Sequence, residues 1–100
     1  MTRDEILNTP AGERMNQQIW WKIFDMTPMP PNNDMKKLPD YSGNETAVMG
    51  VIEKFQEVYI EHSKGSVFVM IGDNFNTAVT CETMPLAVCR AALLCTLEEK

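Results

Sequence analysis

The residues able to perform covalent or metal chemistry are few in this chain. His62 is the single histidine, and the three cysteines are Cys81, Cys89 and Cys95. A nucleophile needs a nearby base, and a structural zinc site takes four nitrogen or sulfur ligands. His62 has no predictable partner, and the cysteines lack CxxC spacing and lie among apolar residues. We therefore predict no metal site and no cofactor, and we interpret the cysteines as buried free thiols.

Carboxylate pairs and phosphate-binding loops give no stronger signal. Glu61 with Glu82, or Asp73 with Glu82, would supply an acid and a base, but their spacing does not separate them from surface carboxylates. The sequence contains neither G-x-x-x-x-G-K-[ST] nor G-x-G-x-x-G, the two loops that cradle phosphates. We predict that the chain has no catalytic residues and is not an enzyme.

Three residues are candidates for a binding surface: Trp21, Tyr41 and Arg90. Arg90 interrupts an apolar helical stretch, where an arginine pairs with a carboxylate, reaches solvent by its tip, or contacts an anion or a partner. Tyr41 lies in the proline-interrupted stretch 27–43, which is long for a connection. Two interpretations of this stretch remain open. It is a connector across the sheet edge, or a binding loop with Tyr41 and Trp21 as aromatic contacts.

The elements predicted at residues 66–97 are the framework against which the rest of the chain must position these residues. A strand is predicted at 66–71, and because it is apolar on both faces, it must be covered on both sides. A second strand is expected at 76–82. Thr83 followed by Pro85 is typical of a helix start. The alternating side chains of the first strand are Val67, Val69 and Ile71 on one face and Phe68 and Met70 on the other.

Helical periodicity predicts three further elements upstream. These are a short turn at 2–7 capped by Thr2, a helix from Pro10 to Asp25 or Met26, and a helix after Asn44. Their apolar stripes are Met15, Ile19, Trp20, Ile23 and Phe24 in the first long helix, and Ala47, Val48, Val51, Ile52 and Phe55 in the second.

Residues 57–62 either extend the second helix or form a first strand, and the β-favouring run before a glycine-containing turn favours the strand. The order is then α-α-β-β-β-α after the initial turn. The fold class predicted is α+β, a small α/β/α sandwich in which a three-stranded antiparallel meander has helices on both faces. One hundred residues predict a single domain, 1–100.

Charge and hydropathy exclude several partners. The net charge is −5, and the nine basic residues are scattered, which argues against a nucleic acid partner. No apolar run approaches the ~20 residues of a membrane span. The N-terminus MTRDEILNTP has no apolar segment typical of a signal peptide. We therefore expect a cytosolic protein without a membrane partner.

The C-terminal helix raises the question of assembly. It has two apolar faces, and only one of them can lie on a sheet. The other needs a second helix or a second subunit. With Trp20 and Trp21 adding apolar surface to the first long helix, a two-fold homodimer is predicted. The alternative is a monomer in which the two upstream helices cover everything.

Three segments resemble the phage ABA sandwich domain: LNTPAGERMNQQIWWKIF, PDYSGNETAVMGVIEKF and TAVTCETMPLAVCRAALLCTLEE. They span nearly the whole chain in the same order. The most specific part is ETMPLAVCRAALL at 82–94, with Ala11-Gly12-x-x-Met15 and Tyr41-Ser42 in support. The family's pattern has a glycine where the second helix ends, and this sequence has Gln56-Glu57 there. The resemblance implies a small sandwich with helices on both faces of an antiparallel sheet, and it supplies no catalytic residues.

The resemblance also implies an origin in a phage or prophage genome and a place in the cytoplasm of a bacterial host. Two classes of function follow. The first is a non-enzymatic accessory protein that binds a host or phage protein. The second is a small-ligand binder, which would sequester a nucleotide-like signal in a pocket beneath the stretch 27–43, in a cleft lined by Arg90, Tyr41 or Trp21.

Overall fold

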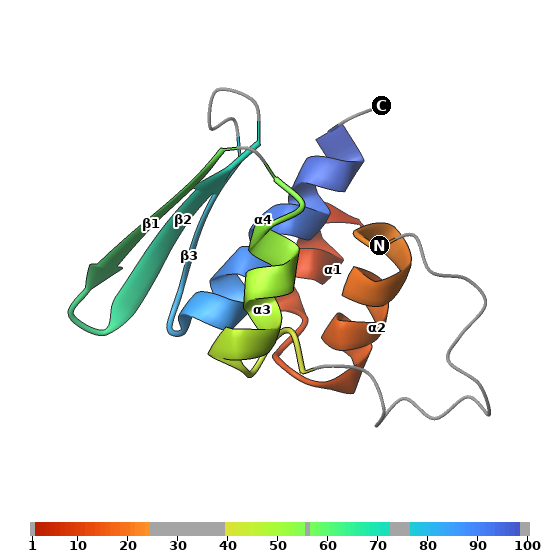
Figure 1. Cartoon of the computed structure of the whole chain (residues 1–100), viewed down its shortest axis with the longest axis horizontal. Coiled ribbons are helices and arrows are strands. Elements are labelled where there is room, and N and C mark those ends of the chain that lie inside the picture. Colours follow the sequence, from red (N-terminus) through yellow and green to blue (C-terminus); the bar gives the residue numbers. More distant parts are fainter. Residues whose placement is uncertain (1, 25–39, 56, 73–76, 99–100) are drawn as a thin grey trace.

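The computed structural model describes residues 2–24, 40–55, 57–72 and 77–98 (Figure 1). Its strands form one antiparallel sheet in the order β1-β2-β3. This small α+β fold, with its meander, confirms the predicted fold class. In chain order the elements are α1 (Arg3–Asn8), α2 (Glu13–Lys22), α3 (Glu45–Ile52), β1 (Val58–Ser63), β2 (Ser66–Ile71), β3 (Thr77–Cys81) and α4 (Met84–Glu98).

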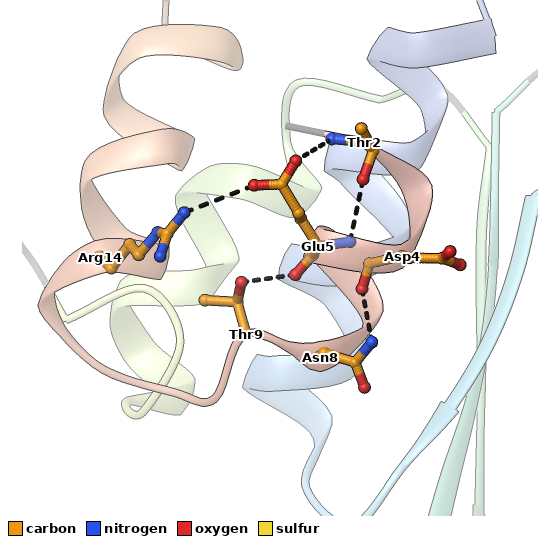
Figure 2. Close-up of polar contacts among 6 residues, drawn as sticks. All are labelled: Thr2, Asp4, Glu5, Asn8, Thr9 and Arg14. Carbon is orange, nitrogen blue, oxygen red and sulfur yellow. Dashed lines mark hydrogen bonds and ion pairs between the residues drawn. The ribbon is translucent and has the colours of Figure 1, made fainter.

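The short helix α1 forms because its first turn is capped from both sides. The Thr2 hydroxyl accepts a hydrogen bond from the Glu5 N–H at 3.2 Å, and the Glu5 carboxylate accepts one from the Thr2 N–H at 3.1 Å (Figure 2). This reciprocal capping box offsets the cost of nucleating a helix of only six residues. The hydrogen bond from the Thr2 backbone also lowers the pKa of Glu5. The predicted helical turn with Thr2 as its cap is confirmed.

The helix predicted to begin at Pro10 begins instead at Glu13, so that boundary was wrong. Thr9 cannot cap α2 because it already closes α1, where its hydroxyl donates to the Glu5 carbonyl. The N-cap is Gly12. Its φ is +147, a backbone conformation that favours a residue without a Cβ. Pro10, two residues upstream of Gly12, lies in the connection between the helices. The predicted end at 25 or 26 was also wrong: those two residues lie outside the described part of the chain, and α2 already ends at Lys22, with Ile23 as its C-cap.

The first hairpin settles the alternative left open for residues 57–62. They form β1, which pairs with β2 through a turn at Lys64-Gly65 and brings Ser63 opposite Ser66. Gly65 has φ +79, the left-handed conformation that a two-residue hairpin turn requires. The strand expected at 76–82 is confirmed as β3, in which Thr77, Val79 and Cys81 are buried while the residues between them are exposed.

The most apolar helix, α4, packs against β2 and β3 on one side and against α1, α2 and α3 on the other. The second apolar face of α4 required a second layer of helices, and the same chain supplies that layer. The apolar surface that favoured a homodimer is covered within one subunit, and a homodimer, which stays a prediction, needs another surface. The buried residues of α4 and its first turn are Pro85, Ala87, Val88, Cys89, Ala91, Ala92, Leu93, Leu94 and Cys95.

The two faces of the sheet have different environments. Residues paired across the strands share a face, and the face toward α4 is buried on β2 and β3. Sequence analysis placed helices on both faces, whereas the four described helices gather on the α4 side (Figure 1). We call the other face the open face. Its residues, by strand register, are Tyr59 and Glu61 on β1, Phe68 and Met70 on β2, and Ala78 and Thr80 on β3.

The central position of β2 explains how its second face remains apolar without a helix over it. Phe68 lies between Glu61 and Thr80 in the sheet, and Met70 lies between Tyr59 and Ala78. Flanked in this way, Phe68 and Met70 are half-buried.

Truncation of a core side chain of α4 tests this packing. Leu93 is 1% exposed, and Leu93→Ala should lower the free energy of unfolding by about 2–5 kcal/mol because it removes buried methyl groups and leaves a cavity. Chemical denaturation measures the change. Met49→Ala is the control, since Met49 is 49% exposed and its truncation should change stability by less than about 0.5 kcal/mol. A loss that small for Leu93→Ala would contradict the central position of α4.

Candidate functional site

The three candidate binding residues lie in separate settings. Tyr41 is 4% exposed and belongs to the core. Trp21 is half-buried on α2, at the edge of the core as its position off the apolar stripe predicted, and Arg90 is half-buried on α4. Within the described residues, no hydrogen bond or ring contact joins any two of the three. The structure therefore does not gather them into one surface.

Tyr41 is held by aromatic packing. Its ring stacks on that of Phe24, with the centroids 5.2 Å apart and the planes inclined by 23°. The Lys54 ammonium lies 5.3 Å from the Phe24 centroid, within the range of a cation–π contact. Burial raises the pKa of Tyr41. The ring ties the turn before α3 to the residues after α2, and the residues 27–39 of the proposed binding loop lie outside the described part of the chain.

Arg90 forms contacts with neutral groups. Its Nη1 donates to Cys81 Sγ at 3.2 Å, and its Nη2 donates to the Thr9 carbonyl at 2.9 Å. Across the described ranges no carboxylate pairs with it, so the expected structural ion pair is not found there. Its Nε is buried and has no hydrogen-bond partner. Arg90 therefore joins α4 to β3 and to the connection between α1 and α2, through polar contacts that a helix-surface arginine would not make.

A buried polar network joins α2 to the turn before α3. Ser42 is fully buried, and its N–H and hydroxyl both donate to Asn16 Oδ1, at 2.9 and 2.7 Å. The Ser42 hydroxyl in turn accepts a hydrogen bond from the Gly12 N–H at 2.9 Å. Asn16 Nδ2 donates to Asp40 Oδ1 at 2.9 Å. The network holds Gly12, the N-cap residue of α2, by its backbone N–H, and sequence analysis missed it.

The cysteines are buried and free, which confirms that prediction. Burial raises the pKa of the Cys89 thiol far above its ordinary value, and nearby Asp40 adds to the effect. Cys89 is therefore a protonated, inert thiol at neutral pH. Cys95 Sγ lies 3.7 Å from the Ile71 carbonyl, to which it donates. The described residues contain no group of three or more His, Cys, Asp or Glu placed to hold a metal ion.

An open pocket of about 320 Å³ lies at the connection between α1 and α2. Residues 8–14 line it, and none of Trp21, Tyr41 and Arg90 does. Its cationic side chain, Arg14, is directed to Glu5 at 3.6 Å (Figure 2). The pocket thus differs from the predicted cleft for a nucleotide-like ligand. Among the described helices, none has the length and hydropathy needed to cross a membrane.

The open face is the strongest candidate surface among the described residues. Tyr59 is 43% exposed, and its hydroxyl donates to Glu61 Oε2 at 3.0 Å. That hydrogen bond raises the pKa of Tyr59. Ala78 and Thr80 are exposed beside the half-buried side chains of β2. The signal that could have found this surface was the second apolar face of β2, which sequence analysis assigned to a covering helix.

The buried network gives a prediction about stability. Asn16→Ala and Ser42→Ala should each cost about 1–3 kcal/mol, because each leaves buried partners unsatisfied. The double mutant should cost less than the sum, since the two side chains act as one unit. Gln18→Ala on the same helix is the control and should change stability by less than about 0.5 kcal/mol. Additive losses, measured by chemical denaturation, would contradict the network.

Comparison with known proteins gives one match. The family model described as the phage ABA sandwich domain matches residues 13–93. No curated protein and no solved structure matches the chain. The matched range runs from the first residue of α2 into α4 and includes Asn16, Asp40 and Ser42 of the buried network, the whole sheet and Arg90. Because the match covers most of the residues, the chain belongs to the phage ABA sandwich domain family and is a phage-associated protein.

Proposed function

We propose that this protein is a non-enzymatic accessory protein that acts by binding a second protein, of host or phage, through the open face of its sheet. The observation that carries the proposal is the environment of Tyr59. A large aromatic side chain is 43% exposed on a face whose central strand presents Phe68 and Met70. Apolar surface gathered on one face in this way is typical of an interaction site.

The chemistry of the open face favours one kind of partner. Tyr59 supplies an aromatic ring and a hydroxyl, as anchor residues at protein interfaces do. Glu61 places a carboxylate beside it, and the chain carries a net charge of −5. A sheet face of this composition suits an amphipathic helix that has apolar residues on one side and Lys or Arg at its margins.

Quantitative affinity capture from a lysate of infected host cells tests the proposal. The full chain is the bait, and Tyr59→Lys and Thr80→Lys each place a charge on the open face. Met49→Lys and Thr46→Lys are matched controls, because both residues are exposed on α3. One protein should be captured by the native chain and by both controls, and its recovery should fall at least about tenfold with either open-face variant, as expected for a charge buried at an interface.

Two outcomes would contradict the proposal. One is a captured protein whose recovery is the same with the open-face variants as with the controls. The other is a small molecule, found by mass spectrometry of the same eluate, that is retained by every variant and stabilises the purified chain to heat. That second outcome would favour the nucleotide-like ligand of the alternative function.

A further inference from the structure

The outer edge of the sheet is formed by β1, the strand furthest from α4 in Figure 1. Hydrogen-bonded and non-hydrogen-bonded pairs alternate along an antiparallel ladder. The Gly72 N–H donates to the Glu57 carbonyl at 3.2 Å, which marks residue 57 as directed toward β2. Because this direction alternates along a strand, the backbone N–H and C=O groups of residues 59, 61 and 63 are also directed toward β2. The backbone groups of Val58, Ile60 and His62 therefore point outward, to the free edge.

This edge has few of the features that keep edge strands apart. Proline, charged side chains and bulges are the usual protections, and of these β1 has the carboxylate of Glu61. The sequence of β1 is VYIEHS, and its register with β2 is continuous from Val58 to Ser63. Val58 and Ile60 are apolar and only half-buried on the α4 side. The main strand contacts of α4 are with β2 and β3, so these two side chains lie at the margin of the core.

We propose that β1 pairs antiparallel with β1 of a second copy of this chain, about a two-fold axis at Ile60, to form a six-stranded sheet. In this register Ile60 lies opposite Ile60 of the partner subunit, and Val58 lies opposite the partner subunit's His62. All three outward-facing residues then form hydrogen-bonded pairs with the partner subunit. The two residues of each such pair exchange two backbone hydrogen bonds. The interface belongs to the edge and leaves the open face of each subunit accessible.

The charges of β1 select this register. With the axis at Ile60, Tyr59 lies opposite Glu61 of the partner subunit on the open face, and the reverse pair is its symmetry mate. The Tyr59 hydroxyl donates to Glu61 of its own chain at 3.0 Å, and in this register it also lies beside the partner subunit's Glu61, so its one proton has a carboxylate acceptor on either side of the interface. Two neighbouring registers also pair outward-facing residues, with the axis at Glu61 or at Tyr59. The first would place Glu61 opposite its own symmetry mate, and the second would place Glu57 opposite Glu61 of the partner subunit. Directly opposed carboxylates are destabilising in a sheet.

Assembly is tested with the full chain by sedimentation velocity between 1 and 100 µM. A single strand pairing buries less than a standard interface, so the expected result is a concentration-dependent shift from the 11.4 kDa monomer to a dimer. His62→Pro removes an outward N–H and leaves the hydrogen bonds between β1 and β2 in place. It should raise the dissociation constant of the dimer at least about tenfold, the loss expected when backbone hydrogen bonds are removed at an interface. His62→Ala is the control and should dimerise normally.

Disulfide trapping tests the register and remains informative if His62→Pro does not fold. The two Cα atoms of a hydrogen-bonded pair lie about 5.5 Å apart, within the range of a disulfide. Ile60→Cys should therefore form a covalent dimer under mild oxidation. Val58→Cys should not do so alone, but should link to His62→Cys in an equimolar mixture. Dimers from Glu61→Cys and none from Ile60→Cys would overturn the register.

A native chain that remains monomeric at 100 µM would overturn the dimer, as would a dimer that His62→Pro leaves unchanged. These failures are separate from those of the proposed function. Thr80→Lys changes β3, at the opposite edge of the sheet, and should lower partner capture at least about tenfold without affecting dimerisation. His62→Pro should have the opposite effect.

Discussion

The enclosure of α4 is the constraint on which the rest of this structure depends. A helix that is apolar around most of its circumference has to be covered on every side. This chain meets the requirement with β2 and β3 on one side and three helices on the other. Small residues such as Ala87, Ala91 and Ala92, all fully buried, let these elements approach closely. The cost is that every described helix is used on one side of the sheet, and the open face receives none.

The most specific residues of the family resemblance serve this enclosure. Arg90, in the segment 82–94, fastens α4 to the connection before α2 through the Thr9 carbonyl. Ser42 fastens the turn before α3 to Gly12. Arg90 holds the connection between α1 and α2 against α4, and Ser42 joins the start of α2 to the turn before α3. The family's recognisable motifs are therefore explained by packing, and the surface proposed to bind a partner lies elsewhere, on the strands.

Local patterns in the sequence were sufficient for much of the fold. The alternation along β2, the β-favouring run in β1 and the capping signal of Thr2 each depend on neighbours within a few residues, and each was read correctly. The start of α2 failed because Thr9 has two possible uses, and the preceding helix takes it. A sequence pattern does not show which of two helices a shared residue will serve.

The candidate site depended on contacts between distant residues, which a sequence without structure does not show. Tyr41 is of a residue type that is common at binding surfaces, but the ring of Phe24 stacks on it and the core encloses it. Asn16 and Ser42 are 26 residues apart, and no local pattern indicates that their side chains hydrogen-bond. For β2, periodicity indicated two apolar faces correctly, but it could not indicate that neighbouring strands, and no described helix, would flank Phe68 and Met70.

The central claim is that the helices occupy one side of the sheet and leave the other open. Hydroxyl-radical footprinting measures this directly, because methionine and tyrosine side chains react according to their exposure. The account predicts rapid modification of Tyr59 and of Met49, slower modification of half-buried Met70, and protection of Met15, which is fully buried. Protection of Tyr59 and Met70 to the level of Met15 in the monomer would contradict it, because that result requires a second layer over the open face.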